Sequence, residues 1–223
     1  MKRFLTLALV LCSSAALAED AKTQVTPASA KTTTAARPLH RHPTLLGMLR
    51  RNNDVRRRLG LRPHRINPAL TKAAQDHANY MAQTSVFDHY SNGGPQYRAG
   101  KYGFRGGVLE NIACGTRSVS STFSMWEGSG AHYASIVSGT SDAGFGYAIA
   151  PNGQCYWVGV YANATKTDTA GETEEQVAAA LEAEKKALAE EAAQVDPNVT
   201  PASTSEPVEE VSPAPAKAPK SAE

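Results

Sequence analysis

Large apolar and aromatic side chains are confined to one stretch of this 223-residue chain, and only that stretch can form a hydrophobic core. Every tryptophan and tyrosine, and every phenylalanine except Phe4, lies within residues 40–164. A stretch of that length is typical of one domain with its own core. The sequence therefore predicts one folded domain over residues 40–164 and other roles for the two ends.

The first residues have the pattern of a secretory signal peptide. Two basic residues precede an apolar run from Phe4 to Leu11, and an A-x-A cleavage site ends the pattern at Ala18. The run is shorter than the ~18–20 residues that cross a bilayer, so removal of residues 1–18 would leave no transmembrane segment. Cys12 raises the alternative of lipidation, but Leu11 stands where such a signal needs a small residue. We expect a protein that is secreted or held in the periplasm or cell envelope.

Three further segments differ from the domain in composition. Residues 19–39 are rich in Thr, Ala, Ser and Lys, which predicts a disordered linker. Residues 165–196 are rich in Ala and Glu and predict a helix, with Thr173 and Gln176 as its capping box. Residues 197–223 are rich in proline and predict a disordered tail.

Charge is distributed unevenly, although the formal net charge is only +2. Residues 37–65 carry many arginines against one acidic residue, Asp54, whereas the chain after Thr165 is acidic. A basic stripe can bind nucleic acid or an anionic surface, and the alternative is a solvated helix face. In an exported protein we expect no nucleic-acid partner, and we expect the domain to be monomeric.

The first half of the domain has helical periodicity. The spacing of apolar residues predicts one helix over 44–60 and a second over 67–83, which Asn67 and the proline after it would begin. His77 falls on the apolar side of the second helix and is interpreted as a core residue. Residues 89–115 are interrupted by glycines and are predicted to be largely loop, with one short helix.

The end of the domain has a hairpin pattern. Two runs rich in aromatic and β-branched residues flank Asn152-Gly153, a dipeptide that tolerates positive φ. Helices followed by a hairpin indicate an α+β domain with an antiparallel sheet.

Signal cleavage would remove Cys12 and leave two cysteines, Cys114 and Cys155. In an oxidising compartment two cysteines favour a disulfide, which is our prediction. The alternative is a pair of buried thiols.

Three polar residues stand at expected loops or element boundaries, where functional side chains gather: His89, Glu110 and His132. Two imidazoles and a carboxylate could hold Zn²⁺ and leave a fourth position open. They could equally form a hydrogen-bonded relay in which Glu110 orients one histidine as a general base.

Six motifs spread over residues 44–162 resemble, in their order, those of the CAP superfamily. That superfamily comprises the cysteine-rich secretory proteins, antigen 5, the plant pathogenesis-related 1 proteins and bacterial secreted relatives. The resemblance implies an α+β fold, an α-β-α sandwich with a central antiparallel sheet and a cleft. The motifs are INPALTKAAQDHANYMA, VFDHYS, LENIACG, MWEGSGAHYASIV, AGFGYAI and YWVGVYA.

The resemblance also implies a set of site residues. The family's first histidine, in F-x-H, matches His89, and its glutamate, in E-N-I-A, matches Glu110. Its second histidine, in W-x-x-S-x-x-H, matches His132. Ser129 stands where many eukaryotic members carry a further glutamate, and Leu109 replaces the usual glycine, so the shape and charge of the cleft differ here.

Three functions remain open at this point. In the first, the cleft binds Zn²⁺ through His89 and His132, with Glu110 as a weak ligand or orienting group, and takes a small-molecule, lipid or cell-envelope ligand. In the second, the protein is a metal-assisted, peptidase-like hydrolase with Ser129 as the candidate nucleophile, although H-E-x-x-H and nucleophile-elbow motifs are absent from the sequence. In the third, it is a structural envelope protein that acts through its tail. We favour binding over catalysis and assign no catalytic residue.

Overall fold

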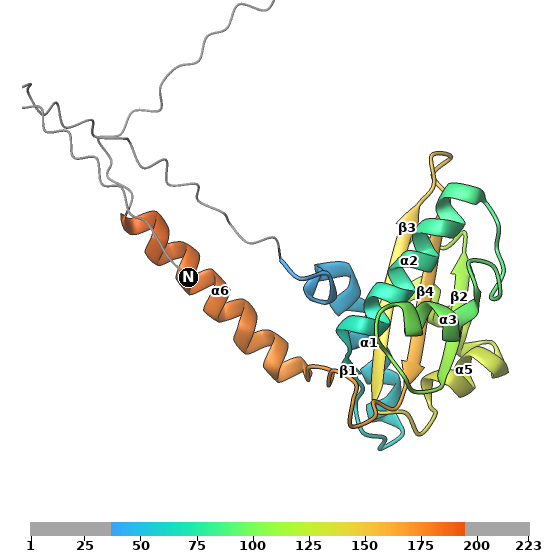
Figure 1. Cartoon of the computed structure of the whole chain (residues 1–223), viewed down its shortest axis with the longest axis horizontal. Coiled ribbons are helices and arrows are strands. Elements are labelled where there is room, and N and C mark those ends of the chain that lie inside the picture. Colours follow the sequence, from blue (N-terminus) through green and yellow to red (C-terminus); the bar gives the residue numbers. More distant parts are fainter. Residues whose placement is uncertain (1–36, 195–223) are drawn as a thin grey trace, which may run out of the picture. The chain divides into compact units, whose positions relative to one another are not determined.

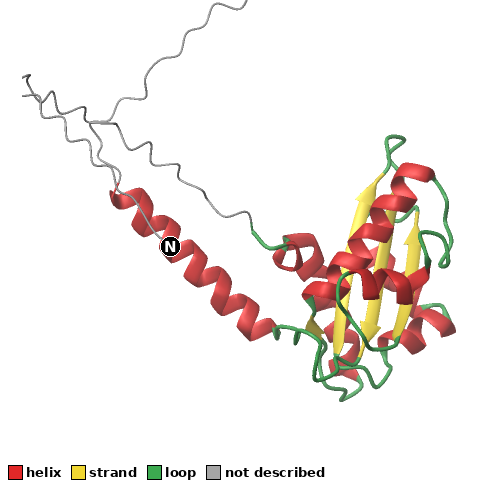
Figure 2. Ribbon diagram, in the orientation of Figure 1, coloured by secondary structure: helices red, strands yellow, loops and turns green. Residues whose placement is uncertain are grey.

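The computed structural model describes residues 37–194, in which helices cover both faces of one four-stranded sheet (Figure 2). The predicted signal peptide, most of the predicted linker and the proline-rich tail lie outside these residues. The elements, in chain order, are η1 (Leu39–Arg41), α1 (Pro43–Arg58), β1 (Arg65–Ile66), α2 (Pro68–Thr84), α3 (Gly94–Lys101), β2 (Val108–Cys114), α4 (Val119–Glu127), α5 (Gly130–Ile136), β3 (Asp142–Ile149), β4 (Cys155–Ala162) and α6 (Glu174–Gln194).

The strands lie in the order β1-β3-β4-β2. β4 is antiparallel to both of its neighbours, as predicted, and all of its residues are buried. The two-residue β1 adds to the far side of β3 in parallel, so the sheet is mixed rather than purely antiparallel. β2 forms the opposite edge of the sheet.

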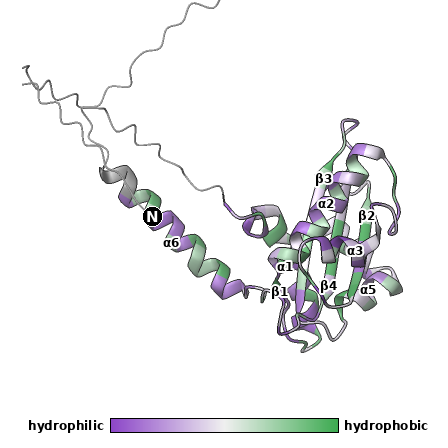
Figure 3. Ribbon diagram, in the orientation of Figure 1, coloured by the Kyte–Doolittle hydropathy of each residue, from purple (hydrophilic) through white to green (hydrophobic). Residues whose placement is uncertain are grey.

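Two apolar layers sandwich the sheet and confirm the predicted α-β-α architecture. α2 and α3 cover one face, and Leu70, Met81 and Phe104 lie in that layer. α1, α4 and α5 cover the other face, where Trp126 and Phe145 are fully buried. Figure 1 shows α2 running across the sheet, and Figure 3 shows the apolar stretches of β2 and β3 beneath the helices.

Two glycines in the AGFGYAI motif allow α2 to approach the sheet closely. A Cβ atom at Gly144 would collide with the α2 backbone at Leu70, and one at Gly146 would collide with it at Ala74. Any larger residue would force the helix away from β3, so these glycines set the spacing between the two layers.

The predicted α2 start and the predicted hairpin are confirmed. The side chain of Asn67 accepts hydrogen bonds from the backbone N–H groups of Ala69 and Leu70, at 3.0 and 3.3 Å. At the hairpin, Ala150 N donates to Gln154 O at 2.8 Å, which leaves a three-residue loop in which only Gly153 has positive φ, +81°. The turn therefore has a type I plus bulge geometry instead of a two-residue Asn-Gly turn.

The prediction of loop over residues 89–115 is wrong in its last part, because Val108–Cys114 is strand β2. The predicted disulfide is wrong as well, since Cys114 and Cys155 are both free. Cys114 lies opposite Tyr156, the neighbour of Cys155, and successive side chains on a strand point to opposite faces. The two thiols consequently belong to different layers of the sandwich.

A buried polar cluster under α1 is centred on His64, which is 1% exposed. Asn52 Nδ2 donates to His64 Nδ1 at 3.0 Å, and His64 Nε2 lies 2.9 Å from Thr140 Oγ1. Asn53 forms a pair of hydrogen bonds with the His64 backbone, at 2.8 and 3.0 Å. Burial, together with the charge of Arg56, lowers the pKa of His64 to about 3.

The packed chain continues beyond residue 164. Glu172 and Ile66 exchange two backbone hydrogen bonds of 2.8 Å, and the Glu172 carboxylate binds Arg41 in a bidentate pair at 2.9 and 3.1 Å. On α6, Val177 is buried in the layer of α1 and is 3% exposed. The capping box predicted at Thr173 is confirmed by its reciprocal hydrogen bonds with Gln176. No helix within residues 37–194 is long and apolar enough to cross a membrane.

Candidate functional site

The loop between α2 and α3 presents His89. Ser85, in the left-handed conformation, ends α2, and the Asp88 carboxylate then accepts the backbone N–H groups of Tyr90 and Ser91, at 3.0 and 2.6 Å. This side-chain turn reverses the chain around His89. His89 is therefore held in this turn, and its side chain is 39% exposed.

Glu110 of β2 joins this loop to α3. Its Oε1 lies 3.0 Å from His89 Nδ1, and its Oε2 accepts a 2.6 Å hydrogen bond from Arg98 Nη2. The side chains of Glu110 and Arg98 are 2% and 1% exposed, so the carboxylate charge is balanced inside the protein. Arg98 also donates to the carbonyl groups of His89 and Ser91, at 3.1 and 2.6 Å, and so fixes the loop and the carboxylate together.

His132 approaches β2 from the other side of the sheet, on α5. The side chain of Asn111 donates to the His132 carbonyl at 2.9 Å, and the buried Trp126 donates to the Ile112 carbonyl at 3.3 Å. These bonds tie the GSGAH segment to the strand. His132 Nδ1 is buried and has no hydrogen-bond partner among the described residues. Burial, and then the neighbouring His89, lowers the pKa of the His132 imidazole.

Sequence reasoning selected His89, Glu110 and His132, and the structure brings all three to the same strand. It did not select Arg98, which supplies the counter-charge. Nothing in the local sequence marks this residue, because the pairing arises only when α3 docks beside β2. His77 is fully buried, as interpreted, and its Nε2 lies 3.1 Å from the Asp88 carbonyl.

Ser129 is the N-cap residue of α5, and its hydroxyl makes no hydrogen bond to either histidine within residues 37–194. Glu127, one residue after Trp126, is turned away from the cluster and binds Arg51 and Arg58 of α1. Neither side chain is part of the constellation.

The cluster fits a metal only in part. Both oxygens of Glu110 are engaged, by His89 and by Arg98, which leaves two imidazoles as candidate ligands. Across the part of the chain that the structure describes, no three His, Cys, Asp or Glu side chains are grouped so that they could hold a metal ion. Glu110 therefore fits the role of an orienting carboxylate better than that of a ligand.

Comparisons with known proteins agree with this fold. The sequence profile of the cysteine-rich secretory protein family, CAP, matches residues 49–161. An outer surface protein from Borrelia burgdorferi is similar in structure, with a TM-score of 0.50 and 19% identity over 54% of this chain and 92% of that one. An extracellular protein containing a SCP domain from Bacillus anthracis has a TM-score of 0.48 and 18% identity over 54% of this chain and 40% of that one. No curated protein matches the chain.

Proposed function

This chain belongs to the cysteine-rich secretory protein family, CAP, and on that premise we propose that it is an exported protein whose cleft binds a divalent cation through His89 and His132. Zn²⁺ is the ion that two imidazoles favour and the one to test. Export is supported by the signal-peptide pattern that ends at Ala18, and the similar Borrelia protein is by name an outer surface protein.

The hydrogen bond between His89 and Glu110 carries the proposal. A carboxylate that accepts the proton of Nδ1 fixes the tautomer in which Nε2 carries the free lone pair, as in many histidine ligands of metals. Because Arg98 holds the other oxygen of Glu110, the carboxylate is kept in this orientation.

His132 supplies the second candidate nitrogen. Its lowered pKa keeps the imidazole neutral at pH 7, and the neutral form is the one that binds metals. Its Nδ1 has no partner within residues 37–194, so a bound ion or ligand would satisfy a buried polar atom. Water or a ligand would complete the coordination.

Titration calorimetry of Zn²⁺ into the mature chain tests the proposal. We expect binding in the wild type, loss of most of the heat in His89→Ala/His132→Ala, and weakening of about 10-fold to 100-fold in Glu110→Gln, which loses the orienting charge. His42→Asn is the matched control, because it removes an exposed imidazole outside the cleft and keeps an N-cap side chain for α1. Equal binding by the wild type and the double variant would refute the proposal.

A further inference from the structure

The edge strand β2 has one side without a neighbouring strand. Gly115 N donates to Cys155 O at 3.0 Å, and bonded pairs alternate along an antiparallel ladder. The register then assigns Leu109, Asn111 and Ala113 to the bonds with β4. The other residues of β2 must direct their N–H and C=O groups outward, away from the sheet; they are Val108, Glu110, Ile112 and Cys114.

Two independent hydrogen bonds agree with this assignment. The bond from Ala150 N to Gln154 O shows that the even-numbered residues of β4 form their backbone hydrogen bonds with β3. The odd-numbered residues of β4 are therefore the ones that bond with β2. The carbonyl of Ile112 accepts the Trp126 indole N–H at 3.3 Å, which requires it to point out of the ladder.

The outward groups of Val108 and Glu110 remain unpaired. Trp126 occupies the Ile112 carbonyl, whereas no hydrogen bond within residues 37–194 involves the backbone N–H or C=O of Val108 or Glu110. Glu110 is also the residue whose side chain holds His89. The open backbone therefore lies inside the candidate site, where an unpaired edge can template a further strand.

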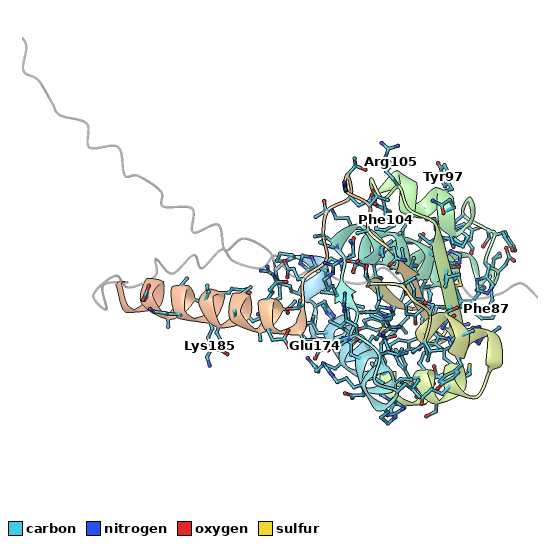
Figure 4. The ribbon with its side chains drawn as sticks, turned by 90° about the horizontal axis from the view of Figure 1, so that it is seen from below. Phe87, Tyr97, Phe104, Arg105, Glu174 and Lys185 are labelled. Atoms are coloured by element: carbon cyan, nitrogen blue, oxygen red, sulfur yellow. The ribbon has the colours of Figure 1, made fainter. Side chains whose placement is uncertain are left out.

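The surroundings indicate what kind of chain would pair there. A pocket of about 390 Å³ runs beside the edge and is lined by His89, Tyr90 and Leu109, among others. Tyr90 is 80% exposed, Leu109 is 43% exposed, and Tyr97 on α3 is 64% exposed. Figure 4 shows Tyr97 on the β2 side of the domain.

The charged groups that line the pocket limit the kind of segment that could bind there. The carboxylate of Glu110 is the only acidic group among the described residues that line the pocket, and Arg98 neutralises it. A charged segment would find no complementary charge there, whereas an uncharged segment with apolar side chains would meet Tyr90 and Leu109.

We propose that the outer edge of β2 binds an extended, uncharged peptide segment of a partner protein as an added strand, which pairs with the backbone of Val108 and Glu110. The loop that carries His89 and the helix that carries His132 flank this edge from the two faces of the sheet. The inference concerns the cleft proposed for Zn²⁺ but does not require the metal.

The test uses a fluorescent peptide of alternating Thr and Val with blocked ends, titrated with the full mature chain in buffer that contains EDTA. The control peptide has the same sequence with N-methyl groups at alternate residues. Methylation removes the backbone N–H donors needed for pairing but keeps the side chains. We expect the N-methylated peptide to bind about tenfold more weakly or worse, since a tenfold loss equals the strength of one or two hydrogen bonds.

Val108→Pro is the matching protein variant, because proline is tolerated at the first residue of an edge strand and removes the outward donor. We expect this variant to lower the affinity for the unmodified peptide by a similar factor and to leave Zn²⁺ binding unchanged. Tyr90→Ser tests the side-chain contact without altering the backbone, and Ile149→Ser, an exposed apolar residue outside the pocket, is its control.

Equal affinity for the two peptides, or no binding of the unmodified peptide at millimolar concentration, overturns the proposal. So does a dimer in sedimentation that Val108→Pro dissociates, because the occupant would then be a second copy. Peptide binding by a wild-type protein that binds no Zn²⁺ would refute the metal proposal alone.

Discussion

Two histidine-centred polar clusters in this domain differ in what they leave unsatisfied. His64 is closed: both ring nitrogens have partners, Asn52 and Thr140, and the side chain is buried. The cluster at β2 is open, because only one nitrogen of His89 is engaged and His132 Nδ1 has no partner within residues 37–194. The first pattern is typical of a structural element and the second of a binding site.

The largest effect on stability should come from replacing Arg98, because its buried ion pair with Glu110 supports the fold as well as the open cluster. Arg98→Met removes the counter-charge of the buried Glu110 and should lower the free energy of unfolding by about 3–5 kcal/mol. Urea denaturation measures this loss. Arg98→Met/Glu110→Gln should recover part of it, and a loss below about 1 kcal/mol in the single variant would show that the ion pair is not buried as described.

The closed cluster around His64 should make the free energy of unfolding depend on pH. Burial lowers the pKa of His64 from 6.5 to about 3, so the unfolded chain binds this proton at higher pH than the folded one. The stability contribution is complete above pH 6.5 and falls by about 1.4 kcal/mol for each pH unit below it, down to about pH 3. The difference in unfolding free energy between the wild type and His64→Gln across this range isolates the effect; a difference independent of pH would contradict the assignment.

The smallest effect on stability is expected at the open histidines. In metal-free buffer, His132→Ala should change the free energy of unfolding by about 0.5 kcal/mol or less, because it leaves no partner unpaired. His89→Ala should lower it by about 1 kcal/mol, because one oxygen of the buried Glu110 loses its partner. Thermal unfolding measures both. A loss as large as that in the Arg98 variant would remove the distinction between the two clusters.

Local patterns predicted the parts of the fold that depend on neighbours in sequence. Asn67 and the proline after it marked the start of α2, and Asn152-Gly153 marked the hairpin. β2 was missed because VLENIAC carries Glu110 and Asn111 in its middle, and their roles are set by contacts with α3 and α5. No alternation of polar and apolar residues announces such a strand.

The motifs predicted which residues form the site, but not how they are partnered. The pairing of Glu110 with Arg98 depends on the docking of a helix against a strand, and the sequence contains no trace of it. The same limit applies to Cys114 and Cys155, because only the register between β2 and β4 reveals that their thiols point to opposite faces. Residue identity could be predicted, whereas pairing required the tertiary structure.

The contact between Arg41 and Glu172 joins the start of the folded domain to the segment that leads into α6. Because these two segments are neighbours, a circular permutation that links them should preserve the sheet. If the protein is tethered through one end and bound through the other, tension would reach Val177, this ion pair and the short backbone ladder at Ile66 before it reached β3 and β4. These contacts would therefore break first under tension, while the cleft beside β2 remains folded.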